Sequence, residues 1–126
     1  MSTPAVDRDA LIELLDGNPD LIVTIIDSFL DDCPDYMEAI REAIENEDAA
    51  TLEREAHGLK GAAGSLRAKS ASEAALVLEE IGHSGDFTEA EAALDTLERE
   101  IERLTEALRA LRSECQDAST DTCTDT

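Results

Sequence analysis

The feature that most restricts the fold of this sequence is a long stripe of apolar residues towards its C-terminal end. Between residues 87 and 111, apolar side chains recur at alternating spacings of three and four residues. This spacing places them on one face of an α-helix, and so long a seam packs against neighbouring helices at shallow crossing angles. The sequence therefore predicts a helical bundle. The seam consists of Phe87, Ala90, Leu94, Leu97, Ile101, Leu104, Leu108 and Leu111.

Two helices are predicted before this seam, in the first third of the chain. Residues 9–15 form a short amphipathic pattern. Asn18 followed by Pro19 is a typical start of a helix, because Asn caps free N–H groups and Pro suits the first turn. The apolar face of this second helix continues to Ile44, and we expect Pro34 to kink or split it.

A third and a fourth helix are predicted between residues 49 and 81. The third carries a narrow stripe of small and aliphatic residues, Leu52, Ala56, Leu59, Ala63 and Leu66. Ser70 and Glu73 have the spacing of a capping box for the fourth, which is expected to end over residues 82–86. The prediction is an all-α, up-and-down four-helix bundle with a short extra N-terminal helix, over residues 1–112. Residues 113–126 lose the apolar period and are predicted to be a disordered acidic tail.

The charge of the chain excludes several classes of partner. With 31 acidic and 10 basic residues the net charge is −21, which repels nucleic acid and anionic membranes. No signal-like segment and no spanning apolar run is present, so a cytoplasmic protein is expected. Cys33, Cys115 and Cys123 are widely spaced and are predicted to be free thiols. The scarcity of lysine resembles halophile proteins, although many helical bundles are acidic simply for solubility.

His57 is predicted to face outward from the third helix. With the apolar stripe near 0° and about 100° per residue, His57 falls at about 140° and Lys60 at about 80°. A histidine that packs in the core would share the stripe, so His57 is either a solvated surface residue or a functional one. Lys60 lies one turn along, where its ammonium could neutralise an anion held at the ring. Glu53, one turn before His57, could orient that ring.

Gly61 and Gly64 lie on the same predicted surface, although glycine inside a helix costs about 1 kcal/mol relative to Ala. Either a partner approaches the backbone closely beside His57, or the glycines reflect helix fraying or helix–helix contact. Residues 54–69 also carry four basic residues and one acidic residue. This positive island suits an anionic group and an acidic partner, the alternative being a chance cluster on a solvated face.

The run AHGLKGAA at residues 56–63 resembles the AHxLKGxA motif of histidine phosphotransfer domains, which are four-helix bundles. The resemblance extends to residues 29–34 and to Leu78-Glu79. It implies that His57 is the phosphoacceptor, Lys60 the cation beside the phosphate, and Gly61 the gap that admits a response regulator. One departure is Arg67, which stands where the family often has a glycine after the histidine helix.

The same resemblance implies a carrier of phosphoryl groups in a phosphorelay. Its expected partners are response-regulator receiver domains and a hybrid sensor histidine kinase, and the chain is expected to be a monomer. Phosphoryl transfer uses Mg²⁺ held by carboxylates, and the resemblance assigns this ion to the response regulator. No cofactor of its own is expected, since the sequence has no P-loop and no GxGxxG.

Two other functions fit parts of the sequence. Glu80 and His83 have the Glu-x-x-His spacing of di-iron bundles, but Arg54 stands where the second copy would need its glutamate before His57. His83 more simply complements the dipole at a helix end. The other alternative is a non-catalytic adaptor bundle that pairs with another chain through the seam of its last helix.

Overall fold

The structure, a computed structural model, describes the backbone of residues 5–124 and the side chains of residues 5–116. It contains five helices, α1 (Arg8–Leu14), α2 (Pro19–Glu45), α3 (Ala49–Ser65), α4 (Lys69–Ser84) and α5 (Ala90–Thr124). Within residues 5–124 there is no strand. The predicted all-α class is confirmed, including the short extra helix at the N-terminus.

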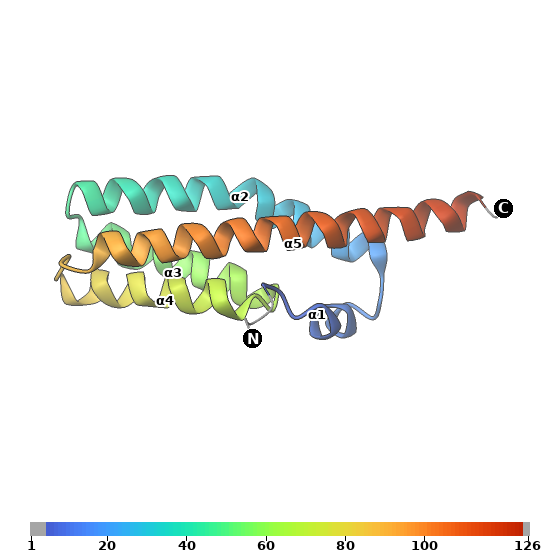
Figure 1. Cartoon of the computed structure of the whole chain (residues 1–126), viewed down its shortest axis with the longest axis horizontal. Coiled ribbons are helices and arrows are strands. Elements are labelled where there is room, and N and C mark those ends of the chain that lie inside the picture. The colour runs from blue at the N-terminus through green and yellow to red at the C-terminus, as the bar shows by residue number, and fades with distance from the viewer. Residues whose placement is uncertain (1–4, 125–126) are drawn as a thin grey trace.

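Helices α2 to α5 form the bundle, and they run side by side in alternating directions (Figure 1). Helix α3 packs most extensively on α4, α2 contacts both α3 and α5, and α4 contacts α5. These are the neighbours of an up-and-down bundle. The predicted stripe of α3 and the seam of α5 both face the core. The largest fully buried side chains are Leu11, Ile26, Ile40, Leu52, Leu59, Leu66, Leu78, Leu97, Leu104, Leu108 and Leu111.

Capping hydrogen bonds at the ends of the helices allow the loops between them to be short. The Asn18 side chain accepts hydrogen bonds from the N–H groups of Asp20 and Leu21, which confirms the predicted cap of α2. Helices α2 and α3 are each followed, two residues beyond their last residue, by a residue in the left-handed conformation: Glu47 at φ 51° and Arg67 at φ 60°. In each case the N–H of the next residue bonds back across the last turn, the Schellman arrangement that usually has glycine at this position.

The structure corrects the predicted start of α4 and confirms where it ends. Its N-cap is Ala68, which makes no side-chain cap bond, so the capping box at Ser70 and Glu73 is wrong. Ala68 is buried, and its N–H donates a hydrogen bond to the Ala63 carbonyl in the last turn of α3. Helix α4 therefore begins directly after this turn and not at Ser70. The helix ends within the predicted residues 82–86: Gly82 still lies inside it, and Gly85 provides the left-handed C-cap.

The last helix is longer than its apolar seam. Helix α5 continues to Thr124, whereas disorder is predicted from residue 113; residues 125 and 126 lie outside the described part. No glycine or proline interrupts the helix beyond Leu111. The Arg112 guanidinium binds Asp27 of α2, and Arg8, the first residue of α1, pairs with Glu114. These contacts extend the packing of α5 beyond the seam.

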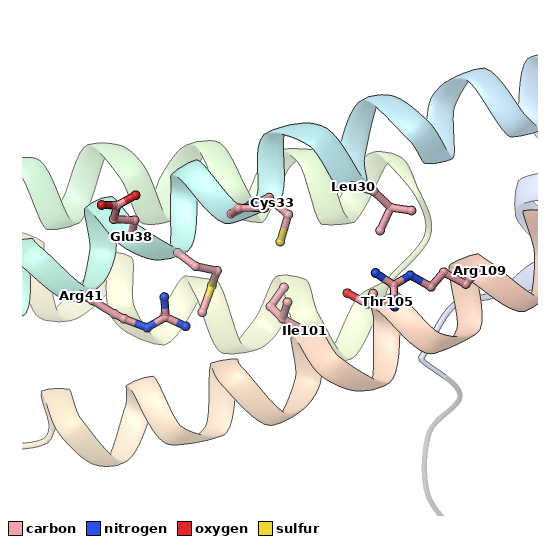
Figure 2. A pocket seen from close by; sticks show the side chains of 9 residues that line it. Leu30, Cys33, Glu38, Arg41, Ile101, Thr105 and Arg109 are labelled. Atoms are coloured by element: carbon pink, nitrogen blue, oxygen red, sulfur yellow. The ribbon is translucent and has the colours of Figure 1, made fainter.

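Pro34 lies inside α2, which stays one continuous helix, so the alternative of a split is excluded. Proline has no N–H to donate, which leaves the Leu30 carbonyl without its intrahelical partner. Both residues line a groove of 630 Å³ between α2 and α5 (Figure 2). Burial raises the pKa of the Cys33 thiol in this groove to about 11, so the thiol stays protonated. Cys33 and Cys115 are free, as predicted, and the side chain of Cys123 lies outside the described residues.

Candidate functional site

His57 stands on the outer surface of α3, as its helical angle predicts. Its side chain is 66% exposed, while Ala56 and Leu59 on either side of it are fully buried. Asp48 caps the helix by accepting a hydrogen bond from the Thr51 N–H, which fixes where the first turn begins. The rotation of α3 is therefore set by its buried stripe, and that rotation directs the imidazole to solvent.

One carboxylate of α4 contacts both His57 and Lys60. Glu79 Oε2 lies 3.0 Å from His57 Nδ1, and Glu79 Oε1 forms an ion pair with Lys60 Nζ at 2.7 Å. The Glu79 side chain is only 19% exposed, so water screens these contacts less than at an open surface. Glu79 thus holds His57 and Lys60 in one group. Sequence reasoning did not assign Glu79 to the site.

Glu79 also selects the tautomer of His57. The Lys60 ammonium, followed by the bond to His57, holds the pKa of the Glu79 carboxyl below its usual range, although partial burial acts in the other direction. An ionised carboxylate only accepts hydrogen bonds, so His57 Nδ1 must carry the proton. The other ring nitrogen, Nε2, then holds a free lone pair in the neutral ring. The geometry provides a nucleophile of defined orientation.

The glycines of α3 have different surroundings. A Cβ added at Gly61 would meet nothing within 4 Å, so this position is an open notch in the helix surface. A Cβ at Gly64 would lie 3.7 Å from Ser72 Oγ, an ordinary contact. At Gly58 it would lie 2.8 Å from Tyr36 Cε1, closer than atoms approach without displacement. Gly61 therefore fits the predicted gap beside His57 better than Gly64 does.

Glu53, which by its helical position could orient His57, does not contact it. Glu53 Oε2 instead lies 2.9 Å from Nδ1 of His83 on α4. Because α3 and α4 are antiparallel neighbours, each histidine meets a carboxylate of the opposite helix rather than one on its own. The described residues contain no group of three His, Cys, Asp or Glu side chains suited to a metal ion.

The other basic residues of the predicted island lie along the exposed surface of α3 and at the start of α4. Arg54 contacts Glu55 at 3.6 Å and Lys69 contacts Glu73 at 4.0 Å, and both basic side chains are largely exposed. Such exposed pairs neutralise each other only partly, because the charges stay solvated. Arg67 is exposed at the turn between the helices. The island is thus a surface feature next to His57.

Comparison with known families decides what this arrangement belongs to. A sequence profile described as the Hpt domain matches residues 24–116, which include His57, Lys60 and Glu79. The chain belongs to the Hpt domain family. The matched span covers the greater part of the four-helix bundle and leaves out α1.

A solved structure agrees with this assignment to the Hpt family. The chain is similar to histidine-containing phosphotransfer protein B (HptB) from Pseudomonas aeruginosa PAO1, with a TM-score of 0.83 and 25% sequence identity. The alignment covers 90% of this chain and 98% of the Pseudomonas chain. Curated protein sequences gave no match. Together the family and the fold identify this chain as an Hpt protein that acts in a phosphorelay. Members of this family interact with kinases and response regulators.

None of the helices in the described part of the chain combines the length and the apolar character needed to cross a membrane. The long helix α5 carries charged residues along its length, outside its apolar seam.

Proposed function

We propose that this Hpt protein carries the phosphoryl group on Nε2 of His57 and exchanges it with the aspartate of a response-regulator receiver domain. The observation that carries the proposal is the contact between His57 Nδ1 and the ionised Glu79, which in the neutral ring places the proton on Nδ1 and the lone pair on Nε2 of an exposed side chain. Resemblance of residues 56–63 to the AHxLKGxA motif supports the same histidine.

The transfer step follows from this tautomer. The Nε2 lone pair attacks phosphorus of the receiver's aspartyl phosphate, an N–P bond forms, and the bond between phosphorus and the aspartate oxygen breaks. The receiver carboxylate leaves with the electron pair of that bond. The ring gains positive charge while its Nδ1 proton remains on the hydrogen bond to Glu79, whose negative charge stabilises the phosphorylated imidazolium. The reverse step returns the phosphoryl group to an aspartate.

Three neighbours assist His57 in this proposal. Lys60 places its ammonium beside the site, where it offsets the charge of the arriving phosphoryl oxygens. The notch at Gly61 lets the receiver's loops approach the backbone of α3, and Gly64 lies further along the same surface. The receiver supplies Mg²⁺, and the chain contributes no cofactor of its own. The protein therefore acts as a carrier and depends on its partners for the metal.

The partners follow from the same chemistry. A hybrid sensor histidine kinase, through its own receiver domain, is the proposed donor or acceptor on one side, and a separate response regulator on the other. The positive island around His57, in a chain of net charge −21, favours docking to the acidic edge of such a site. We further propose that the protein works as a monomer in the cytoplasm, where these partners expose their receiver domains.

The proposal is tested by incubating the protein with a receiver domain charged by acetyl phosphate in the presence of Mg²⁺. We expect acid-labile, base-stable phosphate on the peptide that contains His57, and none when Mg²⁺ is chelated before the receiver is charged. Absence of phosphate on the wild-type protein with receivers that phosphorylate other Hpt proteins would overturn the proposal. Phosphate on a peptide that lacks His57 would show that another residue is the phosphoacceptor.

A further inference from the structure

Tyr36 of α2 lies against the backbone of α3 at the residue that follows His57. The distal end of its ring occupies the space where a side chain at position 58 would begin: an added Cβ at Gly58 would lie 2.8 Å from Cε1 and 3.2 Å from the hydroxyl oxygen. The close approach therefore requires glycine at position 58. Glycine costs about 1 kcal/mol relative to Ala inside a helix, so this pairing of Tyr36 with Gly58 opposes the local preference of the chain.

The ring is placed beside the open notch of α3. Gly58 and Gly61 are three residues apart and are therefore neighbours on the helix surface. Gly61 is open, whereas Gly58 is covered by Tyr36. On the other side of α3, Lys60 and Glu79 form their ion pair. A partner that enters the notch thus meets the Tyr36 ring on the α2 side and the Lys60–Glu79 pair on the α4 side.

Tyr36 is also chemically suited to contact a partner. Its side chain is only partly buried, and within residues 5–116 its hydroxyl makes no hydrogen bond. Tyr is enriched at the centres of protein interfaces, because a rigid ring supplies apolar contact and its hydroxyl supplies a polar one. Among the described residues, the exposed large apolar side chain of α2 is Leu21, which lies in the first turn of the helix, far along the chain from the site.

We propose that Tyr36, held against Gly58, is a docking residue that sets how tightly a receiver domain binds over His57. The inference rests on the proposed function and adds to it a contact on the α2 side of the site. The partner it fits is the face of a receiver domain around its phosphorylated aspartate, because that aspartate must reach Nε2 of His57. Tyr36 itself touches no reacting atom, so its effect is on binding and not on the chemical step.

The test is the dependence of transfer rate on the concentration of a phosphorylated receiver domain, chosen as one that phosphorylates the wild-type protein. Tyr36→Ala should raise KM by about tenfold, the size expected for loss of an aromatic interface contact, while kcat changes less than twofold. Tyr36→Phe should restore most of the lost affinity, because it keeps the ring. Leu21→Ala removes an exposed apolar side chain elsewhere on α2 and should leave KM unchanged.

A double-mutant cycle separates docking from packing. Gly58→Ala forces the Tyr36 ring away from α3, so it should raise KM in the wild-type background and have no effect when Tyr36 is already Ala. An unchanged KM in Tyr36→Ala, or parallel losses of kcat and thermal stability with no change in KM, would overturn the inference. If the wild-type protein itself accepts no phosphate, the proposed function has failed and not the docking role of Tyr36.

Discussion

Helices α3 and α4 carry two histidines in reciprocal pairs. His57 of α3 contacts Glu79 of α4 at 3.0 Å, and His83 of α4 contacts Glu53 of α3 at 2.9 Å. In both pairs Nδ1 faces the carboxylate, so both rings have the same nitrogen directed away from it. A histidine held by a carboxylate is therefore not what distinguishes the Hpt site from the rest of this surface.

The surroundings of the two rings differ. Three residues after His57 stands Lys60, whereas three residues after His83 stands Asp86, a carboxylate engaged by Thr88. Four residues after His57 is the open Gly61, but the corresponding residue after His83 is Phe87. Of the two histidines, only His57 combines a cation three residues later with an open glycine inside its own helix. The comparison teaches that charge compensation and access, rather than the histidine–carboxylate bond, set the proposed acceptor apart.

The largest effect is expected when the proposed acceptor, His57, is itself removed. His57→Gln should abolish phosphorylation by a charged receiver while the helical circular dichroism signal stays unchanged, since an exposed side chain contributes little to packing. His83→Gln is the matched control and should transfer at the wild-type rate. Phosphate on the His57→Gln protein, or loss of transfer only in His83→Gln, would reverse the roles assigned to the two histidines.

The open notch is tested by filling it in two steps. Gly61→Gln should slow transfer by about a hundredfold, since a misplacement of about 1 Å at a reacting centre has effects of this size. Helicity should be equal or higher, because Gln favours helix over Gly. Gly61→Ala adds a single Cβ into open space and should slow transfer far less. Equal transfer by Gly61→Gln and wild type would show that the notch is not used in docking.

The cation beside His57 is tested by Lys60→Ala, which should slow transfer by about tenfold and shorten the lifetime of the phosphohistidine, as one neighbouring charge is lost. Lys69→Ala removes a more exposed lysine of the same island and serves as the control. Single-turnover transfer and the decay of labelled protein measure the two effects. A Lys60→Ala protein that matches Lys69→Ala in both assays would remove Lys60 from the site.

The carboxylates of the two histidine pairs can be compared in the same way, with a smaller expected effect on the transfer rate. Glu79→Gln leaves an amide that can donate as well as accept, so the Nδ1–H tautomer of His57 is no longer enforced, and transfer should fall severalfold. Glu53→Gln alters only the His83 pair and should have no effect on transfer. Nitrogen NMR of labelled histidine measures the tautomer directly. An unchanged Nδ1–H population in Glu79→Gln would refute the orienting role.

The smallest effect concerns stability and leaves transfer intact. Arg67 adopts φ 60° at the end of α3, where the family often has glycine. A side chain in this left-handed conformation costs about 1 kcal/mol, so Arg67→Gly should stabilise the fold by about that amount. Lys69→Gly, within the first turn of α4, should destabilise it instead. Urea denaturation measures both, and a less stable Arg67→Gly protein would show that the arginine makes compensating contacts.

The sequence by itself determined the features that depend on local periodicity. The seam from residue 87 to 111, the stripe of α3 and the outward angle of His57 all follow from about 3.6 residues per turn, and the structure confirms them. The cap at Asn18 is equally local. Lys60 and Gly61 could be placed beside His57 for the same reason, because residues three and four apart on a helix are neighbours.

Only the tertiary structure decided which residues meet across helices. Glu79 was not assigned to the site and Glu53 was assigned to the wrong histidine, because both depend on the register of α3 against α4. That register is fixed at Gly82, where an added Cβ would lie 2.5 Å from the Glu53 backbone nitrogen. Helical periodicity fixes how a helix is turned about its own axis, but only packing fixes how far it slides along its neighbour.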